Sequence, residues 1–187
     1  MRVFAALPLS SEIRKLLSEA MDKLGLSYKY LKMVPEANLH ITLHFFGEID
    51  EEKTEKLKSV LDDPLLTGRI IKASLGRLGF FPARSNPRVI FCTLKEGAEE
   101  VVSFRKTFNE IIHNSGLAVE EEGRSFTPHI TLARNKGGRI DPHFLNSFDL
   151  EQRVFLFDRL ILYQSILRST GAEHSPLKTL IFTREGK

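Results

Sequence analysis

The sequence predicts an α+β protein whose strands pair in antiparallel sheets. Strand-like segments, in which apolar residues fall at every second position, alternate along the chain with segments whose apolar residues recur at helical spacing. Several strand-like segments are joined by short turns, which antiparallel neighbours allow and parallel neighbours do not. No stretch of linker composition divides the 187 residues, so we expect one domain spanning residues 1–187.

The first half of the chain predicts the order strand, helix, strand, helix. Residues 2–7 form the first predicted strand, and Ser10 is placed to cap a helix that Gly25 ends. Residues 39–47 predict the second strand, because β-branched and aromatic side chains alternate along them. Asp50 is placed to cap the second helix.

The second half predicts a longer helix, a short helix and several strands, assigned on the same grounds of apolar period, caps and turn residues. In chain order these are strands over 70–81 and 88–94 joined by a turn at 82–87, a helix over 97–115, a strand over 126–134, a flexible loop over 135–139, a short helix capped by Asp141, and strands over 151–165 and 174–184 with a turn near Gly171.

Composition excludes several classes of protein. Hydrophobic residues make up 42% of the chain and 27 cations face 24 anions, so neither a disordered nor a fibrous class fits. A net charge of +3 permits an anionic substrate but does not indicate one. No apolar run has membrane-spanning length, and Cys92 is the only cysteine. We therefore expect a cytoplasmic protein, monomeric, with Cys92 as a core thiol and no contact with membranes.

The most informative pattern is an internal repeat. Leu39-His40-Ile41-Thr42-Leu43 returns as Pro128-His129-Ile130-Thr131-Leu132, after 129 − 40 = 89 residues. Side chains alternate across a strand, so His40 and Thr42 share one face while Ile41, Leu43 and Phe45 share the other. The second copy repeats this division.

Two imidazoles and two hydroxyls in this arrangement suit the chemistry of a phosphate ester. Residues two apart on a strand lie roughly 6.5 Å apart, close enough for a histidine and a threonine to contact one phosphate. If the halves pack with approximate two-fold symmetry, His40 and His129 face one phosphorus atom from opposite sides, one as base and one as acid. The sequence offers no carboxylate-rich or Cys/His grouping for a metal, so we expect a reaction without metal or cofactor.

These segments resemble the 2H phosphoesterase superfamily, and within it the RNA 2′,3′-cyclic phosphodiesterases known as LigT-like proteins or 2′-5′ RNA ligases. The similarity runs through residues 2–7, 38–48, 126–134 and 162–165, in the order of that family's signature segments. The resemblance implies a bilobed fold with pseudo-two-fold symmetry, in which two antiparallel sheets line a central groove and helices pack outside. It assigns the catalytic roles to His40, Thr42, His129 and Thr131.

The activity that the resemblance implies is hydrolysis of the 2′,3′-cyclic phosphate at an RNA end, tRNA fragments being one candidate source, to a 2′-phosphate. We first consider His129 as the base and His40 as the acid, and the exchange of these roles stays open. Three alternatives also stay open: action on 2′,5′-linked RNA in ligation or cleavage, action on small cyclic nucleotides, and binding of RNA ends without turnover.

Four further residues are candidate substrate-binding residues. Phe46 and Phe81 lie near predicted strand ends, where a ring can stack on a base. Arg134 follows the second motif on the face opposite His129, from which strand twist can bring its guanidinium to the groove rim. Arg168 follows a predicted strand at a place from which it can reach the phosphate.

Other residues are assigned smaller parts. His44 is expected on the face of His40 in a groove-edge or structural role, while His113 and His143 are expected to face solvent. The loop 136–139 carries Lys136 and Arg139 and can follow an RNA backbone or stay a solvated turn. His174 marks a departure, because members of the resembled family often carry an aromatic residue there.

Overall fold

The computed structural model describes residues 1–67, 70–82, 86–117, 126–169 and 171–183. Its elements are β1 (Arg2–Pro8), α1 (Ser11–Ser27), β2 (Leu31–Met33), the 3-10 turn η1 (Glu36–Asn38), β3 (His40–Glu48), α2 (Glu51–Val60), α3 (Pro64–Thr67), β4 (Ile71–Phe81), β5 (Val89–Glu96), α4 (Ala98–Asn114), β6 (His129–Asn135), α5 (Pro142–Ser147), β7 (Val154–Phe157), β8 (Arg159–Leu167) and β9 (Ala172–Ile181). Residues 83–85 of the predicted turn and Arg184, the predicted end of the last strand, lie outside the described residues.

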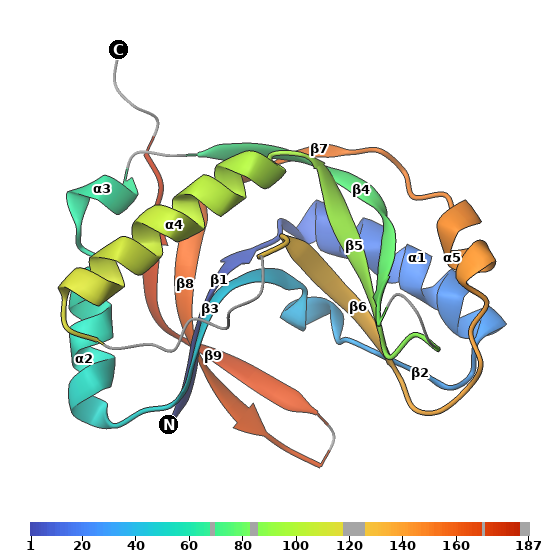
Figure 1. The fold of residues 1–187 in the computed structure, drawn as a ribbon, viewed down its shortest axis with the longest axis horizontal. Helices are drawn as coiled ribbons and strands as arrows, with labels where there is room; N and C mark the ends of the chain where they lie inside the picture. The colour runs from blue at the N-terminus through green and yellow to red at the C-terminus, as the bar shows by residue number, and fades with distance from the viewer. Residues whose placement is uncertain (68–69, 83–85, 118–125, 170, 184–187) are drawn as a thin grey trace.

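The described strands form one antiparallel sheet, which confirms the predicted α+β class. Its order is β7-β4-β5-β6-β3-β1-β8-β9, and β2 adds to β6. Among these strands, the two halves of the sheet join where β3 and β6 touch, through the single pair Ile41 and Ile130. The two predicted sheets are thus the halves of one sheet that splays apart on either side of this pair (Figure 1).

The two long helices pack against different strands of the sheet. Helix α1 follows β1 and contacts β2 and β6, whereas α4 follows β5 and contacts β3, β4 and β5 (Figure 1). Both helices bury an apolar stripe at the predicted spacing. These stripes are Ile13, Leu17, Ala20, Met21 and Leu24 in α1, and Val101, Phe104, Phe108 and Ile112 in α4.

The predicted helix starts are confirmed, but one predicted end is wrong. Ser10 and Asp50 accept hydrogen bonds from the backbone N–H groups of Ile13 and Lys53, as N-caps do. Helix α1 runs past Gly25 to Ser27, because the backbone N–H of Tyr28 donates to the Leu24 carbonyl and closes the last turn later. Glycine lowers helix propensity, but packing against the core outweighs this cost.

Two predicted strands differ from the observed ones. The strand expected over 126–134 begins only at His129, since Pro128 has no N–H to donate to a ladder. The strand expected over 151–165 is two strands, β7 and β8, that separate at Asp158 and pair in opposite halves of the sheet. The short strand β2 lies in a segment for which the sequence predicts no strand.

Among the helices of the described residues, none has the length and apolar character needed to span a bilayer. Cys92 is fully buried in β5, as expected for a core thiol, and burial raises the pKa of its thiol to about 12.

Candidate active site

Both motif strands carry a β-bulge at the same place. Along β3 and β6 the side chains follow the same pattern of burial, with the histidine and threonine half-buried and the residues between and after them buried. In β3 the register against β1 skips Leu43, and in β6 the register against β5 skips Leu132. A bulge inserts one extra residue and so reverses which face the following side chains point to.

Hydrogen bonds from elsewhere in the fold hold these two bulges. The carbonyl of Leu43 accepts from the Arg105 guanidinium of α4 at 2.8 Å. The carbonyl of Leu132 accepts from the backbone N–H of Val34 at 2.8 Å, next to β2. Each bulge thus keeps its skipped carbonyl hydrogen-bonded, as a buried polar group requires.

The first bulge reverses three placements expected from simple alternation. His44 is buried on the core side, where its Nδ1 lies 2.9 Å from the side-chain oxygen of Asn109, rather than on the face of His40. Phe46 stacks on His44 and packs against Phe108, so this predicted base-stacking ring lies outside the pocket. Phe45, expected in the core, lines the pocket instead and is 47% exposed.

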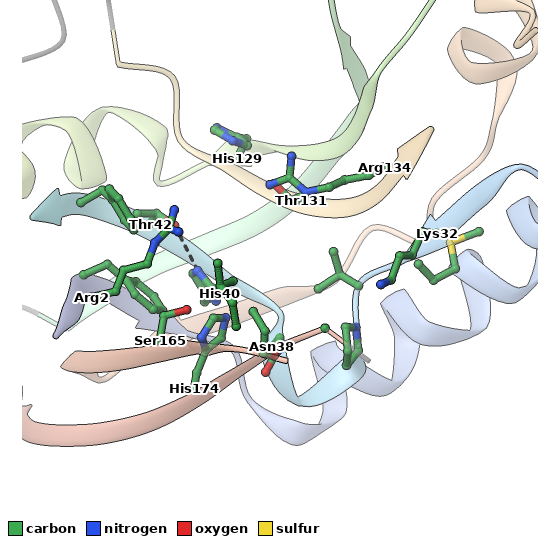
Figure 2. Close-up of a pocket in the computed structure, with 18 of the residues that line it drawn as sticks. Arg2, Lys32, Asn38, His40, Thr42, His129, Thr131, Arg134, Ser165 and His174 are labelled. Atoms are coloured by element: carbon green, nitrogen blue, oxygen red, sulfur yellow. Dashed lines mark hydrogen bonds between the residues drawn. The ribbon is translucent and has the colours of Figure 1, made fainter. Parts of the chain in front are cut away.

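The second bulge brings Arg134 to the pocket. Simple alternation places Arg134 opposite His129, but the extra residue at Leu132 turns its guanidinium to the same side as Thr131 (Figure 2). The predicted position at the groove rim is thus correct, and its cause is the bulge rather than strand twist.

The two motifs converge on one pocket of about 500 Å³. Because Ile41 pairs with Ile130 in an antiparallel register, His40 lies across from Thr131 and Thr42 across from His129. All four side chains line the pocket, with His129 and Thr131 on one wall and His40 and Thr42 on the other (Figure 2). The structure therefore brings together the four residues that the repeat singles out.

His40 sits among aromatic rings that hold it in place. Its ring stacks on Phe4 at a centroid distance of 5.0 Å, and its Nε2 lies 3.0 Å from the Thr42 hydroxyl. Burial lowers the pKa of His40 to about 4, with the nearby charges of His174 and His129 adding to this and a hydrogen bond with the backbone of Asn38 opposing it. The imidazole of His40 is therefore neutral near pH 7.

His129 is oriented by its own backbone. Its Nδ1 lies 2.8 Å from the carbonyl oxygen of Thr127, which fixes the ring with Nδ1–H as donor and leaves Nε2 for the pocket. Phe91 contacts the ring edge-on at 5.1 Å. Phe81 stacks on Phe91 and lies 6.1 Å from His129, so this candidate flanks the histidine although it does not line the pocket itself.

A third histidine, His174 on β9, also lines the pocket. Its ring meets Phe4 edge-on at 4.8 Å and His40 at 5.6 Å. Its Nδ1 is buried and makes no hydrogen bond within the described residues. Burial lowers the pKa of His174, and the backbone of Glu173 partly offsets this.

The pocket is electropositive. Arg2, Lys32, Arg134 and Lys136 line it, and no carboxylate does so among the residues that the structure describes. Likewise, the described residues contain no group of three histidine, cysteine or carboxylate side chains placed to hold a metal ion. The pocket therefore suits an anion held by imidazole, hydroxyl and cationic groups.

The family follows from a direct comparison of sequences. Residues 9–166 match the family described as the 2′-5′ RNA ligase superfamily. The chain belongs to this superfamily. Curated proteins named RNA 2′,3′-cyclic phosphodiesterase include one from Thermus thermophilus, 34% identical over 95% of this chain and 88% of its own, and one from Methanocaldococcus jannaschii, 29% identical over 95% and 99%.

Solved structures of similar proteins share the fold over their full lengths. A crystal structure of a protein from Thermus thermophilus matches with a TM-score of 0.85 and 27% identity, covering 100% of both chains. Escherichia coli LigT in its apo form matches with a TM-score of 0.77 over 98% of both chains, at 24% identity. The predicted superfamily and its fold are thus confirmed.

Arg168, the last of the four candidate substrate-binding residues, lies outside the pocket. Arg168 is exposed on the turn between β8 and β9, where it pairs with Glu173 at 3.1 Å. His113 and His143 are exposed, as expected.

Several residues that line the pocket were not predicted. Phe45 was missed because strict alternation, which ignores the bulge, places it in the core. Arg2, Lys32 and Ser165 were missed because no local pattern shows that their strands lie beside the motif strands. His174 had a signal in the sequence, since a histidine stands where the resembled family often carries an aromatic residue. Arg2 and Ser165 stand in segments that resemble the family's signatures, but nothing singled them out within these segments.

Proposed function

We propose that this chain hydrolyses the 2′,3′-cyclic phosphate at the end of RNA, leaving a 2′-phosphate, by acid–base catalysis between His40 and His129 without a metal ion. The observation that carries the proposal is the convergence of both His-x-Thr motifs on one electropositive pocket. The relatives named RNA 2′,3′-cyclic phosphodiesterase support the substrate class. We place this reaction in the cytoplasm and in a monomer, with tRNA fragments among the candidate RNAs.

His40 is the base in this proposal. Its lowered pKa keeps the ring neutral near pH 7, and we assign it the tautomer in which Nε2, the nitrogen beside the Thr42 hydroxyl, is the acceptor. The Thr42 hydroxyl lies at Nε2 and can rotate toward a phosphoryl oxygen, which makes room for a water molecule. This assignment reverses the order first considered from the sequence, in which His129 was the base.

His129 is then the acid. A water oxygen attacks phosphorus while Nε2 of His40 takes its proton, and the P–O3′ bond breaks as Nε2 of His129 gives a proton to the leaving O3′. The hydroxyls of Thr42 and Thr131 donate to the non-bridging oxygens, where negative charge develops. The product carries a 2′-phosphate and a free 3′-hydroxyl.

The decisive experiment is product analysis on an RNA oligonucleotide that ends in 2′,3′-cyclic phosphate. We expect a 2′-phosphate, full activity in excess chelator, and a loss of about 10²- to 10⁴-fold in kcat for His40→Ala and for His129→Ala, which is what a proton-transfer group contributes. His143→Ala, which changes an exposed histidine away from the pocket, serves as the matched control.

Other outcomes would replace the proposal with a specific alternative. Activity that a chelator abolishes and a divalent ion restores would contradict the metal-free mechanism. Activity confined to 2′,5′-linked RNA or to small cyclic nucleotides would change the substrate. Full activity in both alanine variants, or binding of RNA ends with no turnover of any substrate, would remove the two histidines from catalysis.

A further inference from the structure

One end of the pocket is built by the short strand β2 and the end of β6. These strands pair so that Lys32 and Arg134 are direct cross-strand neighbours. Lys136 follows two residues later and also lines the pocket. These side chains therefore bring three positive charges to one end of the pocket, where an anion can bind.

The two ends of the pocket differ in charge. At the opposite end, Arg2 lies over the ring of Phe45 at 4.8 Å, so the one cation that the described residues place there is stacked on an aromatic face. Lys32, Arg134 and Lys136 lie together on the other side of the two histidines, and Figure 2 shows Lys32 and Arg134 across from Arg2. No ion pair joins Arg134 or Lys136 to a carboxylate within the described residues.

The loop that carries Lys136 is held in place by many hydrogen bonds. The side-chain oxygen of Asn135 accepts from the backbone N–H groups of Gly137 and Gly138 at 3.0 Å each. The side-chain NH₂ of Asn135 donates to the carbonyls of Pro87 and Gly138 at 2.8 and 2.7 Å. Asn86 also donates to the Gly138 carbonyl, at 2.6 Å. The sequence predicts a flexible loop here, and the structure adds these side-chain hydrogen bonds, which no local pattern indicated.

Tyr30 completes the support of the loop. Its carbonyl accepts from the backbone N–H of Lys136 at 3.0 Å, and its ring packs so closely on Gly138 that a Cβ there would lie 2.1 Å from the ring. A loop fixed in this way presents Lys136 to the pocket with little loss of conformational entropy on binding.

We infer that Lys32, Arg134 and Lys136 form a subsite for the phosphodiester that joins the terminal, cyclic-phosphate-bearing nucleotide to the rest of the RNA chain. This inference rests on the proposed function, because it takes the cyclic phosphate to lie between His40 and His129. With that phosphate in place, the RNA strand continues from the 5′ oxygen of the terminal ribose, and the end with three cations attracts its next phosphate more strongly than the end with one. The enzyme should therefore prefer oligonucleotide ends to mononucleotides.

The test compares a nucleoside 2′,3′-cyclic monophosphate with a trinucleotide that ends in 2′,3′-cyclic phosphate. We expect kcat/KM for the trinucleotide to exceed that for the mononucleotide at least tenfold. Lys136→Ala should reduce this ratio about fivefold. The variant should also make the salt dependence of log(kcat/KM) for the trinucleotide shallower by about 0.7, the change expected when one cation fewer binds the phosphates of a single strand.

Arg139→Ala is the matched control, because Arg139 is an exposed cation of the same loop that does not line the pocket. It should keep the ratio and the salt slope of the wild type. Equal melting temperatures for Lys136→Ala and the wild type would exclude a loss of folding as the cause.

The outcomes separate this inference from the proposed function. The subsite is overturned if the mononucleotide is hydrolysed as well as the trinucleotide. It is also overturned if Lys136→Ala changes the preference for the trinucleotide no more than Arg139→Ala does. Either result leaves the proposed reaction standing. If neither compound is hydrolysed, the proposed reaction fails. The subsite is then tested by binding of a fluorescent trinucleotide with a 3′-phosphate, which Lys136→Glu should weaken at least tenfold and Arg139→Glu should not.

Discussion

Phe45 and Arg134 occupy equivalent positions in the two halves of the molecule. Each follows its motif histidine by five residues, 45 − 40 and 134 − 129, and each faces the pocket because of a bulge at the third residue after that histidine. The repeat therefore extends beyond the matching letters of the two motifs, into a shared irregularity of the backbone. It places an aromatic ring at one end of the pocket and a guanidinium at the other.

The first prediction compares Phe45, which the bulge turns toward the pocket, with Phe46, which it turns away from the pocket. Phe45→Ala removes a pocket-lining ring that is 47% exposed, so we expect a rise in KM and almost no change in the free energy of unfolding. Phe46→Ala removes a ring packed between His44 and Phe108, so we expect a loss of about 2 kcal/mol in stability. Denaturant unfolding and steady-state kinetics measure both effects. The reverse result would show that β3 continues without a bulge.

The same bulges mark how far the sequence could predict the site. The repeat identified His40, Thr42, His129 and Thr131 because their positions precede the irregular residue, where strict alternation still holds. Beyond it, alternation placed His44, Phe45 and Phe46 on the wrong faces. No residue type in these strands predicts a bulge, because the bulges depend on tertiary contacts. Arg105 and Val34 supply the hydrogen bonds that the skipped carbonyls need.

The elements of the fold could also be predicted where they depend on local residues, and not where they depend on tertiary contacts. Helix caps and apolar periods depend on local residues, so the starts of α1 and α2 and the extent of α4 were predicted correctly. The break between β7 and β8 was not, because it depends on Asp158 lying where the chain passes from one half of the sheet to the other. The short strand β2 exists only through its pairing with β6.

The second prediction concerns stability and pH. The pKa of His40 is lowered from 6.5 to about 4 in the folded protein, so the unfolded chain binds a proton there more readily. Stability from this histidine is complete above pH 6.5 and is lost as the pH falls toward 4, by up to about 3 kcal/mol. Urea unfolding of the wild type and of His40→Phe over this range measures the difference. A His40→Phe variant whose stability falls as steeply as that of the wild type would refute the assignment.

The third prediction concerns His174 and the pH profile of the reaction. As the base, His40 must be neutral, so kcat/KM should fall on the acid side as the pH drops through its pKa. The positive charge of His174 is the second cause, after burial, that lowers this pKa. His174→Phe keeps an aromatic ring against Phe4 but removes the charge, so we expect the acid limb to move to higher pH. The exposed His143→Phe should leave it in place, and a limb that stays fixed in both variants would show that His174 does not act on His40.

The last prediction uses a difference between the two threonines. Thr42 and Thr131 are matched in the motifs and both line the pocket, but the Thr42 hydroxyl also lies 3.0 Å from Nε2 of its own histidine. Thr131→Val removes a donor to the phosphoryl oxygens, so we expect kcat to fall about 10²-fold with an unchanged pH profile. Thr42→Val should lower kcat similarly and also shift the acid limb upward, since the hydroxyl donates to the neutral form of His40 and so disfavours its protonation. Thr42→Ser and Thr131→Ser keep the hydroxyl and should restore most of the activity. Identical pH profiles for the two valine variants would place the Thr42 hydroxyl on the substrate alone and leave the base without a side-chain partner at Nε2.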